Sequence, residues 1–169
     1  MGVEPCVHLK GSTEYPAMLP KVQPDVCPLD ISVLAVSPHP EDHRRLTDIF
    51  QHSRWQLRTA SNLAEALSIL SATAVPVVIC EYRLEDGDWR VLQQLARSLE
   101  IPSRVLVTMR HADESIWAEI LEAGGYDCLP KPFRSDEVYR LVSLAWRSWK
   151  DQFDRGTHFP RSTAAGNRT

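Results

Sequence analysis

The feature that most constrains this fold is a regular alternation of short apolar runs with longer segments of helical spacing. In the longer segments apolar residues recur three and four positions apart, as on the buried face of a helix; they lie at 40–50, 62–70, 91–99, 115–123 and 135–149. The short runs are rich in β-branched residues and predict strands at 30–36, 55–60, 75–80, 103–108 and 126–129. Strands that are apolar along nearly their whole length predict a parallel sheet covered by helices on both faces.

Local signals agree with these helix positions. Pro40 suits the first turn of a helix, where the acidic residues Glu41 and Asp42 complement the helix dipole. Asn62 with Glu65 three residues later resembles a capping box at the start of the second helix. The pair of glycines at 124–125 is expected to end the fourth helix.

The chain has 169 residues, the usual size of one domain, and 43% of them are hydrophobic, so a packed core is expected. Residues 1–29 contain repeated prolines and predict an extended, flexible arm, whereas 151–169 are rich in small polar residues and predict a flexible tail. The folded domain is therefore expected at 30–150. No apolar run approaches the roughly 20 residues of a membrane span, and no secretory signal is visible. A cytoplasmic protein that does not enter a membrane is expected.

Charge and cysteine content exclude several classes of function. The net charge is -3, and the arginines of the tail, Arg155, Arg161 and Arg168, are too few to indicate nucleic-acid binding. The cysteines, at 6, 27, 80 and 128, form no C-x-x-C pair, so reduced thiols are expected. Neither the spacing of Cys6, His8 and Cys27 nor that of His39 and His43 matches a familiar zinc pattern.

Polar side chains follow the predicted strands at the points where they end. Ser37, Pro38 and His39 follow the first strand, Glu81 the third, Thr108 the fourth and Lys131 the fifth. Because ligand sites in parallel sheets form at the carboxyl ends of the strands, these residues are expected to lie together. A carboxylate, a hydroxyl and an ammonium in one place outline a pocket that accepts a phosphoryl group.

At these residues the sequence resembles response-regulator receiver domains, over about 30–150. The run LPKPF at 129–133, preceded by EAGGYD, looks like the family's last-strand signature, and VLVT at 105–108 resembles its fourth strand with the switch hydroxyl. The run at 60–67 is similar to the opening of the family's second helix, and 33–40 aligns with its first strand and acidic loop. The resemblance implies a flavodoxin-like (βα)5 fold, a three-layer α/β sandwich around a five-stranded parallel sheet. It also implies a role in two-component signal transduction.

The departures from the family pattern decide the predicted chemistry. Receivers usually carry acidic magnesium ligands where Ser37 and Pro38 stand, so magnesium binding is expected to be lost or weak. Glu81 stands at the phosphoacceptor position, where its extra methylene moves the carboxylate by about 1.5 Å. It is expected to hold its charge near Lys131 and Thr108 and to imitate part of the phosphorylated state. Cys128 stands where the family often has a large aromatic switch residue.

Two further features are interpreted on the same basis. The loop at 84–89 differs from the family pattern; its Asp86 and Asp88 either bind a cation or, the preferred interpretation, form a solvated acidic turn. Trp117, Trp146 and Trp149 lie on the predicted fourth and fifth helices and either pack in the core or form a partner surface, since receivers commonly pair through that face. Trp146 is the preferred anchor because it lies off the apolar stripe of its helix.

The predicted function is a stand-alone degenerate receiver, without enzymatic activity, that binds proteins independently of phosphorylation. The expected partner is a histidine kinase, a downstream effector, or a second copy of the chain bound through the fourth and fifth helices. Two alternatives stay open. One is a working phosphoacceptor in a phosphorelay that uses Glu81 or Asp86; the other is a thiol or small-ligand sensor that uses Cys80 or Cys128.

Overall fold

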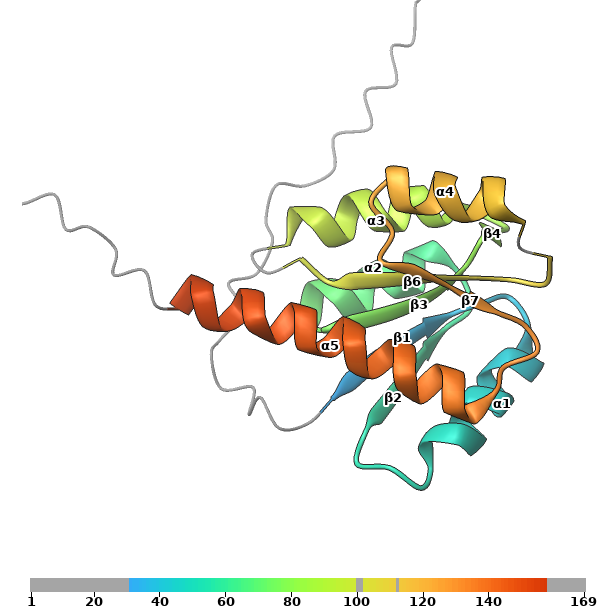
Figure 1. The fold of residues 1–169 in the computed structure, drawn as a ribbon, viewed down its shortest axis with the longest axis horizontal. Helices are drawn as coiled ribbons and strands as arrows, with labels where there is room; N and C mark the ends of the chain where they lie inside the picture. Colours follow the sequence, from blue (N-terminus) through green and yellow to red (C-terminus); the bar gives the residue numbers. More distant parts are fainter. Residues whose placement is uncertain (1–30, 100–101, 112, 158–169) are drawn as a thin grey trace, which may run out of the picture.

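The computed structural model describes residues 31–99, 102–111 and 113–157, which fold around a parallel sheet (Figure 1). The five strands lie in the order β2-β1-β3-β6-β7. Their bounds are β1 Ser32–Val36, β2 Gln56–Ala60, β3 Val77–Glu81, β6 Arg104–Met109 and β7 Asp127–Pro130. The predicted five-stranded parallel sheet is therefore confirmed.

Helices cover both faces of this sheet, as the apolar strands predicted. One face packs against α1 (Pro40–Phe50) and α5 (Ser135–Thr157), and the other against α2 (Leu63–Ala72), α3 (Trp89–Ser98) and α4 (Glu114–Glu122) (Figure 1). Along β1, Val33 and Ala35 face α1 and α5, whereas Leu34 and Val36 face the other three helices. All four are buried. The strand is apolar at every position because neither face meets water.

The local signals at the helix ends are also confirmed. Pro40 is the first residue of α1. The side-chain oxygen of Asn62 accepts a hydrogen bond from the backbone N–H of Glu65 at 2.9 Å. The Glu65 carboxylate in turn accepts from the N–H of Ser61 at 2.7 Å. Two backbone donors at the start of α2 are thereby satisfied, which is the purpose of a capping box.

The position where the last helix ends differs from the prediction. The flexible tail was expected to begin at 151, but α5 continues to Thr157. Contacts made by the last turns of the helix explain the difference. The rings of Phe153 and Trp149 are stacked, with their centroids 5.3 Å apart. Gln152 accepts a hydrogen bond from Arg104 of β6 at 2.7 Å. Lys150 also pairs with Asp154 one helical turn later. The predicted start of the tail at 151 is therefore wrong, because these residues continue the helix as far as Thr157.

Other expectations about the chain ends fall outside the described residues. The proline-rich arm at 1–29, together with Cys6, His8 and Cys27, is not described, and neither is 158–169. Among the helices that the structure describes, none has both the length and the apolar content to cross a bilayer.

Candidate functional site

The site lies at the carboxyl ends of the central strands, where the polar side chains were predicted to converge. Strand register places Glu81, the last residue of β3, beside Thr108 of β6. Lys131 directly follows β7, and Ser37 directly follows β1, the strand that pairs with β3 on its other side. The sheet therefore brings four of the predicted residues to one edge.

The carboxylate of Glu81 is held by two donors. Its Oε2 atom accepts a hydrogen bond from Thr108 Oγ1 at 3.1 Å and a charge-assisted contact from Lys131 Nζ. The three side chains are largely shielded from water, with the Lys131 side chain only 6% exposed. Charge-assisted hydrogen bonds gain strength in such an environment. The expected contact between Glu81, Lys131 and Thr108 is present.

A second carboxylate, from Asp42, completes the pocket and was missed in the sequence. Asp42 Oδ2 lies 2.5 Å from Lys131 Nζ and accepts a hydrogen bond from Ser37 Oγ at 2.6 Å. Asp42 was expected only to complement the dipole of α1, yet it is buried. The available signal was helical spacing, because Asp42 lies on the face of α1 that also buries Leu46, Ile49 and Phe50.

Ser37 organises the loop between β1 and α1. Besides donating to Asp42, its hydroxyl oxygen accepts a hydrogen bond from the backbone N–H of His39 at 3.2 Å. Pro38, between them, has a side chain with neither donor nor acceptor. The loop therefore positions the Asp42 carboxylate through Ser37 rather than supplying carboxylates of its own.

The charges in this pocket are those of an ion pair with one extra carboxylate. The Lys131 ammonium contacts Asp42 and Glu81 at once, which leaves a single net negative charge among the three groups. The ammonium contacts one oxygen of each carboxylate, Asp42 Oδ2 and Glu81 Oε2, so its positive charge would repel a metal cation placed beside them. Within the described residues no three His, Cys, Asp or Glu side chains are placed to hold a metal ion. A divalent cation would have to share both carboxylates with the Lys131 ammonium, and the expected weak binding of magnesium stays a prediction.

The two cysteines near the sheet edge are buried thiols. Burial raises the pKa of Cys80 far above its usual range, and the neighbouring Glu81 carboxylate adds to this effect. Burial raises the pKa of Cys128 to about 11, and the negative charge of Asp127 makes a smaller contribution in the same direction. Thiols react as thiolates, so both groups are poor nucleophiles at neutral pH. This argues against the alternative of a thiol sensor.

The acidic loop after β3 is fastened to the neighbouring helices. It forms a small antiparallel hairpin, β4 (Arg83–Leu84) with β5 (Gly87–Asp88). Asp86 accepts hydrogen bonds from the first backbone N–H groups of α2, at Leu63 (3.0 Å) and Ala64 (3.2 Å). Asp88 caps α3 through the N–H of Arg90 and pairs with its guanidinium. Both carboxylates thus serve as helix caps, a role included neither in the cation-site interpretation nor in that of a solvated acidic turn.

Asp86→Ala is expected to destabilise the fold by about 1 kcal/mol, because two backbone donors at the start of α2 lose their acceptor. In Asp86→Asn one acceptor oxygen is left, because Leu63 and Ala64 donate to two different oxygens of Asp86, so a smaller loss is expected for this variant. Urea unfolding of the three proteins measures the difference. An Asp86→Ala variant as stable as the wild type would show that the two bonds to the start of α2 do not stabilise the fold.

The three tryptophans proposed as partner contacts differ in exposure. Trp149 is buried and stacked on Phe153, and Trp146 is partly buried against the cluster between α5 and the sheet. Trp117 on α4 is 47% exposed, with its indole N–H donating to Asp127 at 3.1 Å. Leu121, one turn further along α4, is also exposed. The preference for Trp146 is therefore not supported, and Trp117 is the exposed candidate.

Comparison with known proteins agrees with this geometry. The model of the response regulator receiver domain family matches residues 33–143. The sensor histidine kinase RcsC of Salmonella typhimurium strain LT2 is 30% identical over 115 residues, which are 68% of this chain and 12% of the relative. The DNA-binding transcriptional regulator NtrC of Escherichia coli K12 is 28% identical over 94 residues, 56% of this chain and 20% of the relative. The chain thus spans a fifth or less of these relatives.

Solved structures show the same fold. The signal receiver domain of an HD domain-containing protein from Pseudomonas fluorescens Pf-5 superposes with a TM-score of 0.67, at 20% identity, over 73% of this chain and 92% of that one. The chemotaxis response regulator CheY4 of Vibrio cholerae gives a TM-score of 0.62, at 17% identity, over 68% of this chain and 97% of that one. At these identities the likeness concerns the fold alone, and it confirms the flavodoxin-like class.

Proposed function

The chain belongs to the response regulator receiver domain family, and from this membership we propose that it is a degenerate receiver whose signalling role does not depend on phosphorylation. It acts by binding another protein and catalyses no reaction. The observation that carries the proposal is the engagement of the Glu81 carboxylate by both Lys131 and Thr108. A negatively charged oxygen already contacts the two side chains that would bind an incoming phosphoryl group.

The chemistry of phosphoryl transfer supports this proposal. Transfer needs a nucleophilic oxygen with a free line of approach and a cation that neutralises the charge on the phosphoryl oxygens. One of the two Glu81 oxygens, Oε2, already contacts an ammonium and a hydroxyl, and the second carboxylate, Asp42, contacts the same ammonium. We therefore propose that the chain works without magnesium, with Lys131 as the cation of the pocket.

The partner is proposed to be another signalling protein. The relatives are named as a sensor histidine kinase and a transcriptional regulator, so a histidine kinase or a downstream effector would fit; a second copy of this chain is the remaining choice. The exposed Trp117 and Leu121 make α4 the favoured contact face, because exposed aromatic residues are good interface anchors. No nucleic-acid partner is proposed.

The proposal predicts that the folded chain takes up no phosphoryl group. Incubation with acetyl phosphate and magnesium, followed by intact-mass spectrometry, is expected to leave the mass unchanged for the wild type and for Glu81→Ala. A phosphorylatable receiver domain in the same reaction is the positive control, and circular dichroism verifies that the chain is folded.

Uptake of a phosphoryl group by the wild type would contradict the proposal, and the two variants would identify the residue that accepts it. A hydroxylamine-sensitive phosphoryl adduct that appears on the wild type and disappears in Glu81→Ala would make Glu81 a working acceptor and overturn the proposal. An adduct that instead persists in Glu81→Ala and disappears in Asp86→Ala would overturn it in favour of Asp86.

A further inference from the structure

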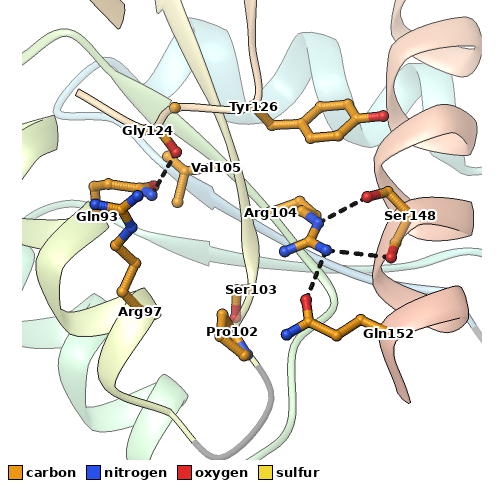
Figure 2. A pocket seen from close by; sticks show the side chains of 11 residues that line it. Gln93, Arg97, Pro102, Ser103, Arg104, Val105, Gly124, Tyr126, Ser148 and Gln152 are labelled. Carbon is orange, nitrogen blue, oxygen red and sulfur yellow. Dashed lines mark hydrogen bonds between the residues drawn. The ribbon is translucent and has the colours of Figure 1, made fainter. Parts of the chain in front are cut away.

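A cavity of about 490 Å³ lies at the end of the sheet opposite to the Glu81 pocket (Figure 2). It is bounded by α3, the start of β6, the turn between α4 and β7, and α5. Arg104, on its wall, is the first residue of β6, whereas Thr108 lies near the end of the same strand. Pockets of this size accommodate small molecules. Any ligand here would be separate from the site described above, and the inference does not rest on the proposed function.

The described residues that line the cavity carry positive charge and include no counter-ion. Its lining includes Arg97 and Arg104 and contains neither aspartate nor glutamate. Arg104 donates from Nε to Ser148 Oγ at 3.0 Å and from Nη2 to the Ser148 carbonyl at 3.2 Å and to Gln152 Oε1 at 2.7 Å. All three acceptors are neutral, and Nη1 has no hydrogen-bond partner within the described part of the chain. Burial lowers the pKa of Arg104, as expected for a cation that lacks a nearby carboxylate.

The second guanidinium, from Arg97, is placed by the turn after α4. Gly124 has a positive φ of 91°, and a Cβ built there would lie 2.6 Å from Arg97 Nη2. The absence of a side chain at Gly124 therefore makes the room in which the Arg97 head lies. Among the described residues Arg97 forms neither a hydrogen bond nor an ion pair, so within this part of the chain no acceptor competes with a ligand for its donors.

An unpaired acceptor lies on the same wall. Gln93 is 5% exposed and donates from Nε2 to the Gly124 carbonyl at 2.6 Å, but its Oε1 atom is buried without a donor among the described residues (Figure 2). Leaving a buried acceptor unpaired is unfavourable by about 1–3 kcal/mol. The cavity thus offers free cationic donors and one acceptor that lacks a partner.

We propose that this cavity binds a small organic phosphomonoester, with its phosphate contacted by Arg97 and by the free Nη1 edge of Arg104. A phosphate has three terminal oxygens and can accept from the Arg97 fork and from Nη1 of Arg104 at once, and its larger negative charge offsets two cations better than the single charge of a carboxylate does. The ring of Tyr126, which lies beside the cavity in Figure 2, is placed to contact the organic part of the ligand.

Phenyl phosphate is the probe for this proposal. Titrated into the isotope-labelled full chain, it is expected to shift the amide resonances of Gly124 and Ser148 in a saturable way. The variant Arg97→Gln removes one guanidinium from an exposed position on α3 and is expected to raise the dissociation constant by about tenfold or more. Arg58→Gln, on the exposed side of β2 and outside the cavity, is the matched control and should bind as the wild type does.

The other outcomes overturn the proposal. An absence of saturable shifts, or equal weakening in the Arg97 and Arg58 variants, would mean that no specific phosphate site exists. Tighter binding of benzoate than of phenyl phosphate would assign the cavity to carboxylates instead. Shifts confined to the residues around Glu81 would place the anion in the other pocket.

Discussion

Lys131→Met is expected to lower the free energy of unfolding by about 3–5 kcal/mol. The variant keeps two largely buried carboxylates, Asp42 and Glu81, but removes the ammonium that both of them contact. Methionine has a similar length and is apolar, so the loss reports uncompensated charge rather than an empty cavity. Urea unfolding, monitored by tryptophan fluorescence, measures it.

Lys150→Met is the matched control for this substitution. Lys150 pairs with Asp154 on the surface of α5, with side chains 34% and 53% exposed. An exposed pair of this kind contributes about 0–1 kcal/mol, so the control variant should be nearly as stable as the wild type.

A triple variant separates charge from packing. In Lys131→Met with Asp42→Asn and Glu81→Gln the pocket has no formal charge, so most of the lost stability should return. If the triple variant were as unstable as Lys131→Met alone, the ammonium would be acting through packing of its methylene groups, and the electrostatic account of the pocket would be wrong.

The convergence of Glu81, Thr108 and Lys131 was predictable from the sequence because it follows from topology alone. Every strand of a parallel sheet ends at the same edge, so residues that follow apolar runs must meet there. The same reasoning could not predict the position of Asp42, because this residue lies on a helix and does not follow a strand. Its position depends on the helical phase set by Pro40, and the same 3.6-residue spacing that places Leu46 and Ile49 in the core also places Asp42 against the sheet.

Exposure of single side chains was less predictable. The spacing of α5 correctly placed Trp149 on the buried face, but it gave no measure of how far the neighbouring elements cover Trp146 or leave Trp117 open. The extra turns of α5 likewise depend on a contact with Arg104, which is distant in the sequence. The cavity beside Arg104 is lined by segments of α3, β6, α5 and the turn after α4. These segments are distant in the sequence, so no local sequence pattern predicts that they form a cavity.

The stability of the fold is expected to fall steeply above about pH 9. The ordinary thiol pKa is 9.0, and burial raises the pKa of both Cys80 and Cys128 in the folded chain. Between pH 9 and pH 11 the folded chain therefore keeps protons on these thiols that the unfolded chain has released. Because the folded state binds more protons, the free energy of unfolding decreases as the pH rises, by about 1.4 kcal/mol per pH unit for each thiol. For Cys128 the loss is complete near its folded pKa of about 11, whereas for Cys80 it continues to higher pH.

Comparison with Cys80→Ala isolates this effect from the titration of tyrosine and lysine residues. The variant is less stable at neutral pH because alanine leaves a small cavity, but that loss is the same at every pH. Its free energy of unfolding, measured in urea under reducing conditions between about pH 8 and pH 10.5, should fall less steeply than that of the wild type, by a difference that approaches about 1.4 kcal/mol per pH unit above pH 9. Contributions from the remaining cysteines are present in both proteins and cancel. Parallel curves would mean that Cys80 titrates alike in the folded and unfolded chains. A thiol so exposed to water would reopen the thiol-sensor alternative that its burial argues against.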